Sequence, residues 1–431
     1  MVMSSTRREF MKATGWCALG AAAATSGVTQ NADAAPAKTA PVKTSPTVIA
    51  VYLRGGADAL SAIVPFTDRD YAKVRPSLAL SGPDSKSARS VLPLDANFGF
   101  NPNMKELHAL YEKGMCAPIT CVGSPHDTRS HFDAQDFMER GAPGQKFIST
   151  GWLNRYLQHT RTSKDANLRA VSLQSLLPRS LRGDYPVLAK PDQNAELAMN
   201  LYYRLYPQKK FKPGEKPPSE NLGQRTRKEI EEFGAKTIEQ LFELTSVLET
   251  APASTARYPT SGFARQMRDL AKLIKADRGF EVSAIDYGGW DHHINEGPVA
   301  GAMGRMLGDV SATLGAFVED IGPLRAQTTL VLVMSEFGRT VHENGNQGTD
   351  HGHGGFMLAV GGKVSGHRVF GRWTGLSEDK LYEKRDLPVH TDFRVVFAET
   401  LKGMFGFDGI KLKLFPEYSA DSPPLGFLGV A

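Results

Sequence analysis

The chain has 431 residues, of which 41% are hydrophobic and 23% are charged, and its formal net charge is only +5. This near balance argues against a dedicated nucleic-acid-binding surface, which would need a concentrated basic stripe. The length suits one large α/β domain with insertions, or two domains. Beyond the N-terminal segment, no stretch is long and apolar enough for a transmembrane helix, so no stable membrane anchor is expected.

The N-terminus carries the parts of an export signal in their usual order. Arg7 and Arg8 are paired and are followed by an apolar residue and a lysine, and a mildly apolar, Ala/Gly-rich run covers residues 13–27. Residues 32–34 (Ala-Asp-Ala) are typical of a signal-peptidase site. We predict a twin-arginine signal peptide over residues 1–34, recognised by the twin-arginine translocase, and a periplasmic or otherwise extracytoplasmic mature protein. A disordered basic N-terminus is the alternative.

After a flexible, Pro- and Lys-rich spacer (35–46), strand and helix patterns alternate. Continuous β-branched runs predict strands buried on both faces, and apolar residues at helical spacing predict helices. The expected strands are 47–53, a segment around Ile119, 170–173, 282–285, 328–334 and 356–360. The expected helices are 103–112, one starting near Ser130, 196–205, 228–248, 263–274, 303–321 and 393–404.

This alternation predicts an α/β fold with a mostly parallel sheet and helices on both faces. The region of about 190–278 is largely helical in pattern and contains a Pro/Lys-rich loop at 207–218. We therefore expect residues 47–431 to form a single domain in which this region is a helical insertion or cap over the sheet.

Polar residues follow nearly every predicted strand, and such sheets bind ligands beyond the carboxyl ends of their strands. Asp and His side chains without cysteine suit Zn²⁺, Mn²⁺ or a similar divalent ion. Residues two apart in an extended chain point the same way, so each His-containing pair in these loops could chelate one ion. The sequence therefore predicts one or two divalent metal ions at one edge of the sheet. The candidate ligands are Asp58, Asp291, His293, Glu336, His351 and His353.

Ser130 stands where a helix is expected to begin, and serine is a preferred N-cap there. The same position also suits catalysis, because a hydroxyl beside a metal ion and a helix N-terminus can be deprotonated and attack a phosphoryl or sulfuryl group. Arg129 and Arg339 could hold the other oxygens of that anion. Each arginine alone is equally typical of a structural ion pair, and Thr128 is an alternative nucleophile.

Seven stretches of the sequence resemble the bacterial family catalogued as domain of unknown function 1501, and they keep the order of that family. They are VYLRGGADAL (51–60), RSHFDAQDFMERG (129–141), GWLNR (151–155), GGWDHH (288–293), MSEFGRT (334–340), GTDHGHGG (348–355) and TDFRVVFAE (391–399). Members of the family typically bear twin-arginine signals, and the family is similar to the alkaline phosphatase and sulfatase superfamily. The resemblance thus implies an alkaline phosphatase-like core.

The superfamily resemblance also implies roles for individual residues: metal ligands after the strands, and a hydroxyl nucleophile. The matching positions, in chain order, are Asp58, Ser130, Asp291 with His293, and His351 or His353. Where the superfamily has Asp-His-Gly, this chain has Glu336, Phe337 and Gly338. Phenylalanine cannot bind a metal, so a second ion would be weaker, ligated differently by Asp350 and His131, or absent.

Two functions from different classes remain open at this point. The first is an exported metal-dependent hydrolase of phosphate or sulfate esters, acting on a small-molecule or polymeric anionic substrate. The second is a non-catalytic periplasmic binding or assembly protein that retains the hydrolase-like fold, which Phe337 favours. A redox protein has no support, because the sequence lacks a Cys-x-x-Cys pair and a nucleotide-binding fingerprint.

Overall fold

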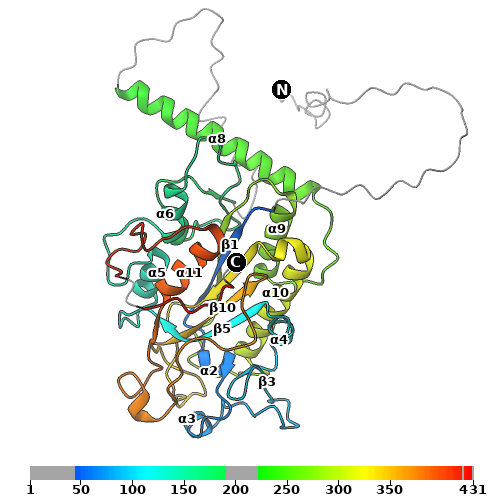
Figure 1. Ribbon diagram of the computed structural model, residues 1–431, viewed down its shortest axis with the longest axis vertical. Coiled ribbons are helices and arrows are strands. Elements are labelled where there is room, and N and C mark those ends of the chain that lie inside the picture. The colour runs from blue at the N-terminus through cyan, green and yellow to red at the C-terminus, as the bar shows by residue number, and fades with distance from the viewer. Residues whose placement is uncertain (1–43, 191–221, 420–421, 430–431) are drawn as a thin grey trace, which may run out of the picture. The chain divides into compact units, whose positions relative to one another are not determined.

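The computed structural model describes residues 44–190, 222–419 and 422–429 (Figure 1). The predicted signal peptide (1–34), most of the predicted spacer, and the helix and loop expected between residues 196 and 218 lie outside these ranges. Within them, every helix is too short or too polar to cross a lipid bilayer.

A six-stranded sheet forms the centre of the fold, in the order β11-β5-β10-β9-β1-β8. Strand β10 runs antiparallel to both of its neighbours, and every other pair in this sheet is parallel. The prediction of an α/β fold with a mostly parallel sheet is therefore confirmed. The strands are β1 (Thr47–Arg54), β5 (Cys116–Gly123), β8 (Val282–Gly288), β9 (Thr329–Met334), β10 (Gly355–Gly361) and β11 (Thr391–Asp392).

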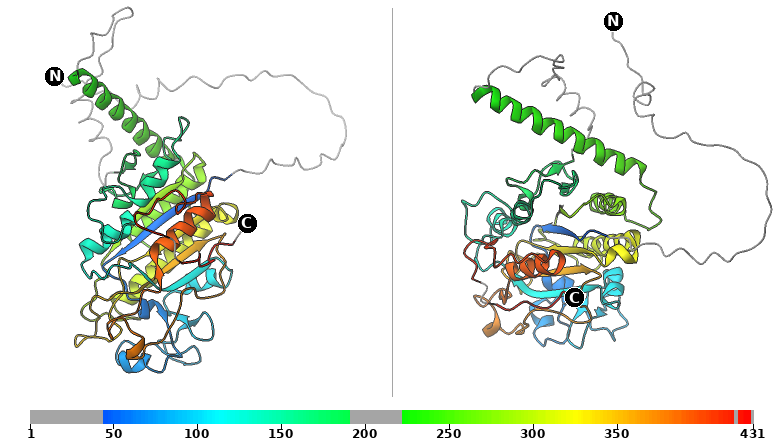
Figure 2. Two further views of the ribbon diagram at one scale, coloured as in Figure 1. Left: turned by 60° about the vertical axis from the view of Figure 1, so that its left-hand side comes forward. Right: turned by 45° about the horizontal axis from the view of Figure 1, so that its top comes forward.

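Helices cover both faces of this sheet (Figure 2). Successive side chains of a strand point to opposite faces, so Ile49 and Val51 of β1 join one hydrophobic core, whereas Val48 and Ala50 join the other. This is why the strand is apolar at every position. The first core is completed by α4 (Lys105–Tyr111), α9 (Gly262–Ala276) and α10 (Ala302–Ala326), and the second by α6 (Trp152–His159) and α11 (Phe393–Phe405).

The expected strand 170–173 is shorter than predicted. It forms β6 (Val171–Ser172), which pairs with β7 (Leu188–Ala189) in a two-stranded sheet, and the preceding Ala170 makes a parallel bridge with Val282 at the edge of the central sheet. The helices expected at 228–248 and 263–274 are confirmed as α8 (Leu222–Thr250) and α9, and α8 packs against α9. The remaining elements are short: α2 (Ala59–Ala62), β2 (Ile63–Val64), α3 (Tyr71–Val74), β3 (Leu92–Pro93), β4 (Gly99–Phe100), α5 (His131–Arg140), η1 (Arg179–Leu181) and η2 (Glu378–Lys380).

The loops that carry the predicted site residues all leave the carboxyl ends of the parallel strands. Close backbone approach at Gly55, directly after β1, brings two of these loops together. Its φ is +125°, and a Cβ there would lie 2.5 Å from the backbone nitrogen of Asp291. Only glycine fits this turn without strain, so the sequence Arg54-Gly55-Gly56 lets the end of β1 pack under the loop that follows β8.

Candidate metal centre

Three potential metal ligands, His131, Asp291 and His351, converge at the carboxyl edge of the sheet. One ligand atom from each lies within 4.8 Å of the others. His131 is the first residue of α5, Asp291 lies in the loop after β8, and His351 lies in the loop before β10. Residues from three distant parts of the chain thus meet where a parallel sheet places its ligands.

His293 adds a third nitrogen, and so a fourth potential ligand, to this group. Its Nε2 atom lies 3.0 Å from Asp291 Oδ1 and 3.0 Å from His351 Nε2. His351 Nε2 lies 3.2 Å from the same carboxylate oxygen. Three imidazole Nε2 atoms therefore approach one carboxylate, and we call His131, Asp291, His293 and His351 the His/Asp centre.

Each of the three imidazoles has an acceptor behind it, on Nδ1. The acceptors are Glu336 Oε1 for His131 (2.8 Å), Asp350 Oδ1 for His293 (2.9 Å) and the Arg129 carbonyl for His351 (2.9 Å). Ionised carboxylates and carbonyls only accept hydrogen bonds, so a neutral ring places its proton on Nδ1. The Nε2 atoms that face the centre then carry lone pairs. Metal-binding histidines are held in the same way by acceptors on the nitrogen that does not bind the metal.

The donor set of the His/Asp centre fits a divalent metal ion. His131 Nε2 is buried without a hydrogen-bond partner among the described residues and lies 3.4 Å from Asp291 Oδ2. Lone pairs that converge at about 3 Å repel one another unless a proton or a metal cation lies between them. Histidine with carboxylate is a ligand set typical of Zn²⁺ and similar ions. The residues that would hold the ion are His131, Asp291, His293 and His351.

The electrostatics of the centre keep its carboxylates charged and His351 neutral, whereas the hydrogen bond to Glu336 raises the pKa of His131. Burial acts to raise the pKa of Asp291 and of Glu336, but hydrogen bonds from Arg339 and from His131, respectively, hold both pKa values below their usual range. Burial, together with the neighbouring His131, lowers the pKa of His351. At neutral pH the carboxylates are therefore charged and His351 is neutral.

Arg339 is a fixed cation beside the ligand carboxylate. Its guanidinium is fully buried and donates to Asp291 Oδ1 at 2.5 Å and to the Gly56 carbonyl at 2.7 Å, with further bonds to the carbonyls of Thr349 and Trp290. The protein itself occupies these donors, so the geometry gives Arg339 the role of orienting Asp291. A second cation beside Asp291 would meet this guanidinium.

Arg129 and Ser130 lie directly before the ligand His131. The Arg129 guanidinium is paired with Asp386 at 2.7 Å and with Glu383 at 2.5 Å, so two carboxylates already neutralise it. Ser130 is the N-cap residue of α5, yet its side chain makes no capping hydrogen bond and is exposed. Ser130 is therefore exposed directly before the ligand His131 in the chain, and the predicted capping bond is absent.

Two residues of the predicted ligand set lie elsewhere in the fold. Asp58 is buried and forms a two-pronged ion pair with Arg75, at 2.5 and 2.9 Å. His353 is buried against the ring of Tyr382, with 4.3 Å between the ring centroids. A third residue of the set, Glu336, supports His131 from behind and does not join the group of converging ligand atoms. The structure thus brings together three of the six predicted ligands and adds His131, which had been considered only for a second ion.

Comparison of the sequence with known protein families identifies the family of this chain. The model of the family "Protein of unknown function (DUF1501)" matches residues 45–413. The chain belongs to the DUF1501 family. The match covers all seven stretches on which the resemblance rested, and no curated protein matches the sequence.

Solved structures offer only distant likenesses to this DUF1501 protein. One is Ps i-CgsB in complex with k-i-k-neocarrahexaose, with 9% identity and a TM-score of 0.37 over 87% of this chain and 75% of the other. Another is the C-terminal periplasmic domain of EcEptC from Escherichia coli in complex with Zn, with 8% identity and a TM-score of 0.32 over 74% and 73% of the two chains. Likenesses at this level carry no argument about the DUF1501 chain, so its function must be argued from the His/Asp centre.

The sequence analysis of this DUF1501 protein missed one cation near the His/Asp centre. Arg385 donates to the backbone carbonyl of His351 at 2.9 Å, and its side chain is 41% exposed. Its other interaction is a longer contact with Asp386, at 3.4 Å. Arg385 is therefore less fully engaged than Arg129 and Arg339. It follows a stretch without strand or helix signals, so no local pattern marked it.

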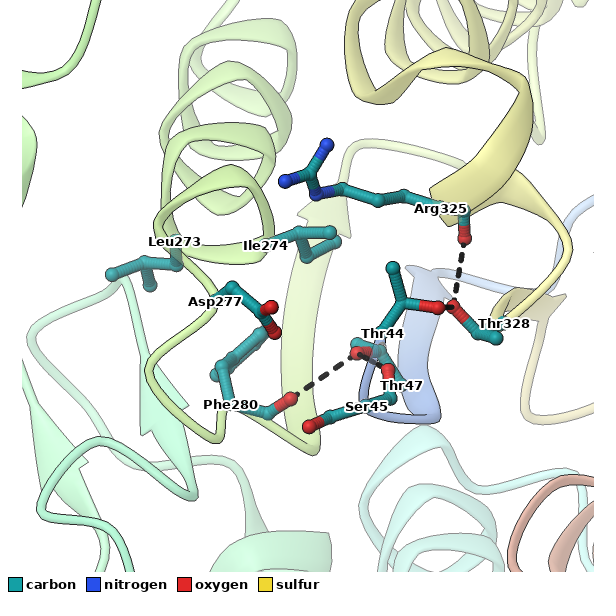
Figure 3. Close-up of a pocket in the computed structure, with 9 residues that line it drawn as sticks. All are labelled: Thr44, Ser45, Thr47, Leu273, Ile274, Asp277, Phe280, Arg325 and Thr328. Carbon is teal, nitrogen blue, oxygen red and sulfur yellow. Dashed lines mark hydrogen bonds between the residues drawn. The ribbon is translucent and has the colours of Figure 1, made fainter. Parts of the chain in front are cut away.

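A small pocket lies at the opposite, amino-terminal end of the sheet (Figure 3). Thr44, Thr47, Phe280, Arg325 and Thr328 are among its lining residues, and its volume is about 10 Å³. The Thr47 hydroxyl donates to the Phe280 carbonyl across it, at 3.2 Å. This space is about enough for a single water molecule, so the pocket is a packing gap and not a binding site.

The Asp58–Arg75 ion pair yields a first prediction about stability. We expect Asp58→Asn to lower the free energy of unfolding by about 3–5 kcal/mol, because the substitution leaves the buried Arg75 guanidinium without a counter-charge. Urea denaturation measures this change. As a matched control, Asp70→Asn breaks the exposed pair with Lys73 and should change stability by less than about 1 kcal/mol. Equal effects of the two substitutions would contradict the structural role of Asp58.

Glu296 gives a second prediction, about pH. Burial and the nearby Asp58 raise the pKa of Glu296 to about 8, and its oxygens accept hydrogen bonds from Ser61 and Thr349 at 2.7 and 2.9 Å. The folded state therefore keeps a proton that the unfolded state releases near pH 4.5. The resulting stability is full below that pH and is lost as the pH rises toward 8.

Glu296→Gln should remove this pH dependence, since an amide of the same shape stays neutral. Melting temperatures measured across that window should fall with pH in the wild type more steeply than in the variant. The exposed Glu239 offers a control, because Glu239→Gln should leave the wild-type slope unchanged. Parallel curves for wild type and Glu296→Gln would exclude a proton held by Glu296.

Proposed function

We propose that this DUF1501 protein is an exported, metal-dependent hydrolase of phosphate or sulfate esters, with an alkaline phosphatase-like core. The observation that carries the proposal is the convergence of three imidazole Nε2 atoms on one carboxylate, each ring supported by an acceptor on Nδ1. The three hydrogen bonds to Nδ1 orient the rings and leave each Nε2 available as a ligand. A histidine with a purely structural role does not need this orientation.

The proposal assigns one divalent ion, such as Zn²⁺ or Mn²⁺, to the His/Asp centre. A bound ion would supply Lewis acidity and lower the pKa of a hydroxyl group beside it. The buried Arg339 already contributes a positive charge to Asp291, and the ring of Phe337 packs 4.9 Å from His131 and 5.1 Å from His351. These two side chains argue for one ion where the superfamily resemblance implied two.

The nucleophile in this proposal is Ser130, with Thr128 as the alternative. The exposed Ser130 hydroxyl would attack the phosphorus or sulfur atom, the ester oxygen would leave as an alcohol after taking up a proton, and water would then release phosphate or sulfate from the serine. Ser130 directly precedes α5, and the N–H groups at a helix N-terminus favour negative charge. Arg385 is the guanidinium best placed to bind the anion, because Arg129 and Arg339 are held by internal partners.

The test is hydrolysis of activated aryl phosphate and aryl sulfate monoesters by protein that contains its native metal. We expect slow turnover that an Asp291→Asn variant loses together with the metal. Metal bound at the His/Asp centre without turnover on any ester would favour the alternative, a non-catalytic periplasmic binding or assembly protein. The internal pairing of Arg129 and Arg339 is the observation that favours this alternative.

Export by the twin-arginine translocase is part of the proposal and rests on residues 1–34. Changing Arg7 and Arg8 together to Lys should leave the precursor in the cytoplasm, because the translocase recognises the arginine pair. Cell fractionation with detection of the precursor and the shorter mature form measures this. A single Lys12→Arg change, which keeps the pair, is the control. Mature double-variant protein in the periplasm would contradict this route.

A further inference from the structure

A second candidate site lies along the edge of strand β5 that faces away from β10, outside the His/Asp centre. Two segments pair with this edge, one after the other. The first is held by Phe370, which exchanges backbone hydrogen bonds with Pro118 and Thr120 at 2.8 and 2.9 Å. The second is β11, whose Thr391 pairs with Val122. Between them opens a cleft of about 440 Å³, which we call the β5-edge cleft.

The cleft is positively charged. Arg368, Arg372 and His390 line it, and none of the described residues that line it is acidic. Arg372 is exposed and has no hydrogen bond or ion pair with any described residue. A cleft with two guanidinium groups and no carboxylate among its described lining residues concentrates positive potential.

One of the two guanidinium groups is fixed in place. The Arg368 guanidinium lies 4.2 Å from the centre of the Phe370 ring, and its Nη2 donates to the Leu425 carbonyl at 3.3 Å. Stacking of this kind orients a guanidinium and leaves its remaining N–H groups free. Gly371 lets the backbone between Arg368 and Arg372 approach strand β5 closely, because a Cβ at residue 371 would lie 2.2 Å from the Thr120 carbonyl oxygen.

The rest of the cleft is apolar. Val395 of α11 and the consecutive prolines Pro423 and Pro424 line it together with Phe370 and Leu425. The volume lies in the range of small-molecule sites, which combine apolar walls with a few oriented polar groups. A guanidinium fork binds a carboxylate through two parallel hydrogen bonds. An anion with an apolar body would therefore satisfy both parts of the lining at once.

We propose that the β5-edge cleft binds an organic carboxylate with an apolar body, at a site separate from the His/Asp centre. Arg372 contributes a positive charge that is unpaired among the described residues, and the oriented guanidinium of Arg368 binds the carboxylate through two hydrogen bonds. Pro423 and Pro424 contact the apolar body of the ligand. The site does not depend on hydrolase activity, so it stands or falls independently of the proposed function.

The probe is 2-naphthoate, with binding measured by calorimetry on the mature protein. We expect saturable binding of one molecule per chain, at least tenfold weaker binding to Arg372→Gln, and an unchanged melting temperature for that variant. Arg69→Gln, which changes an exposed arginine outside the cleft, should bind like the wild type. The neutral 2-naphthamide should bind at least tenfold more weakly than the naphthoate, because it lacks the charge.

Two further arms locate the site. A His351→Ala variant, which alters the His/Asp centre, should bind 2-naphthoate with wild-type affinity. Loss of binding in that variant would place the anion at the His/Asp centre and overturn the proposal. Wild-type affinity in Arg372→Gln, or equal affinity for the amide and the carboxylate, would overturn it as well. Absence of metal or of ester hydrolysis bears only on the proposed function, so the two failures are distinguishable.

Discussion

Protein purified without added metal or chelator is expected to contain about one divalent ion per chain, and a His131→Ala, His293→Ala, His351→Ala variant is expected to retain less than about a tenth of it. The physical reason is that the three imidazole Nε2 atoms all approach the Asp291 carboxylate, at 3.4, 3.0 and 3.2 Å. Elemental analysis of protein taken from the periplasm measures the content. About two ions per chain in the wild type would contradict the role of Arg339 as the second cation.

Two control variants sharpen the metal measurement. His342 is exposed, and its side chain makes no hydrogen bond or ion pair with the four residues of the His/Asp centre. His342→Ala should therefore keep the full metal content. His353→Phe keeps an aromatic ring against Tyr382 and removes a nitrogen that the sequence pattern had assigned to the metal. Full metal content in this variant would support the ligand set seen in the structure, and loss of metal would favour the set predicted from the sequence.

Metal binding should also stabilise the fold. An ion that binds only the folded state adds about 2.7 kcal/mol at a free concentration one hundred times its dissociation constant. Chelator should therefore lower the melting temperature of the wild type and leave that of the triple variant unchanged. A chelator effect of equal size in both proteins would place the ion away from the His/Asp centre.

The elements of the central sheet could be predicted because their signals are local. Residues 47–53 (TVIAVYL) are apolar at every position, and a strand buried on both faces requires this pattern wherever it lies in the sequence. The convergence of the loops was also predictable, since parallel strands bring their carboxyl ends to one edge. The strand at 170–173 is confirmed in shortened form, but its pairing with β7 could not be predicted, because a short apolar run carries no information about its pairing partner.

The ligand set could be predicted only in part, because it depends on side-chain direction. His351 and His353 are two residues apart, which in an extended chain places them on one side. His351 does pair with Arg339 in a short antiparallel bridge, but the chain bends at His353, and that ring turns to Tyr382. Asp58 illustrates a second limit. Its partner Arg75 lies 17 residues away and belongs to no recognisable motif. The sequence therefore did not reveal the buried ion pair, and Asp58 was predicted to be a metal ligand.

Ser130→Ala is expected to reduce turnover on an activated ester by roughly a thousandfold or more, which is the scale of effect seen when a catalytic nucleophile is removed. Metal content and melting temperature should hardly change. The structure sharpens this expectation, because the Ser130 hydroxyl is exposed and makes no capping bond. The substitution should therefore cost less than the ~1 kcal/mol that is typical of a lost N-cap.

Thr128→Ala is the matched control for this prediction. The Thr128 hydroxyl accepts the Ser130 backbone N–H at 3.2 Å, so its removal loosens the same loop without deleting the proposed nucleophile. We expect at most a modest fall in turnover from Thr128→Ala, and no recovery of activity when chloride or a neutral alcohol is added to Ser130→Ala. Full activity of Ser130→Ala with loss of activity in Thr128→Ala would transfer the nucleophile to Thr128. Full activity in both variants would leave water as the attacking group, because the two hydroxyls are the only ones in residues 128–130 that precede the ligand His131.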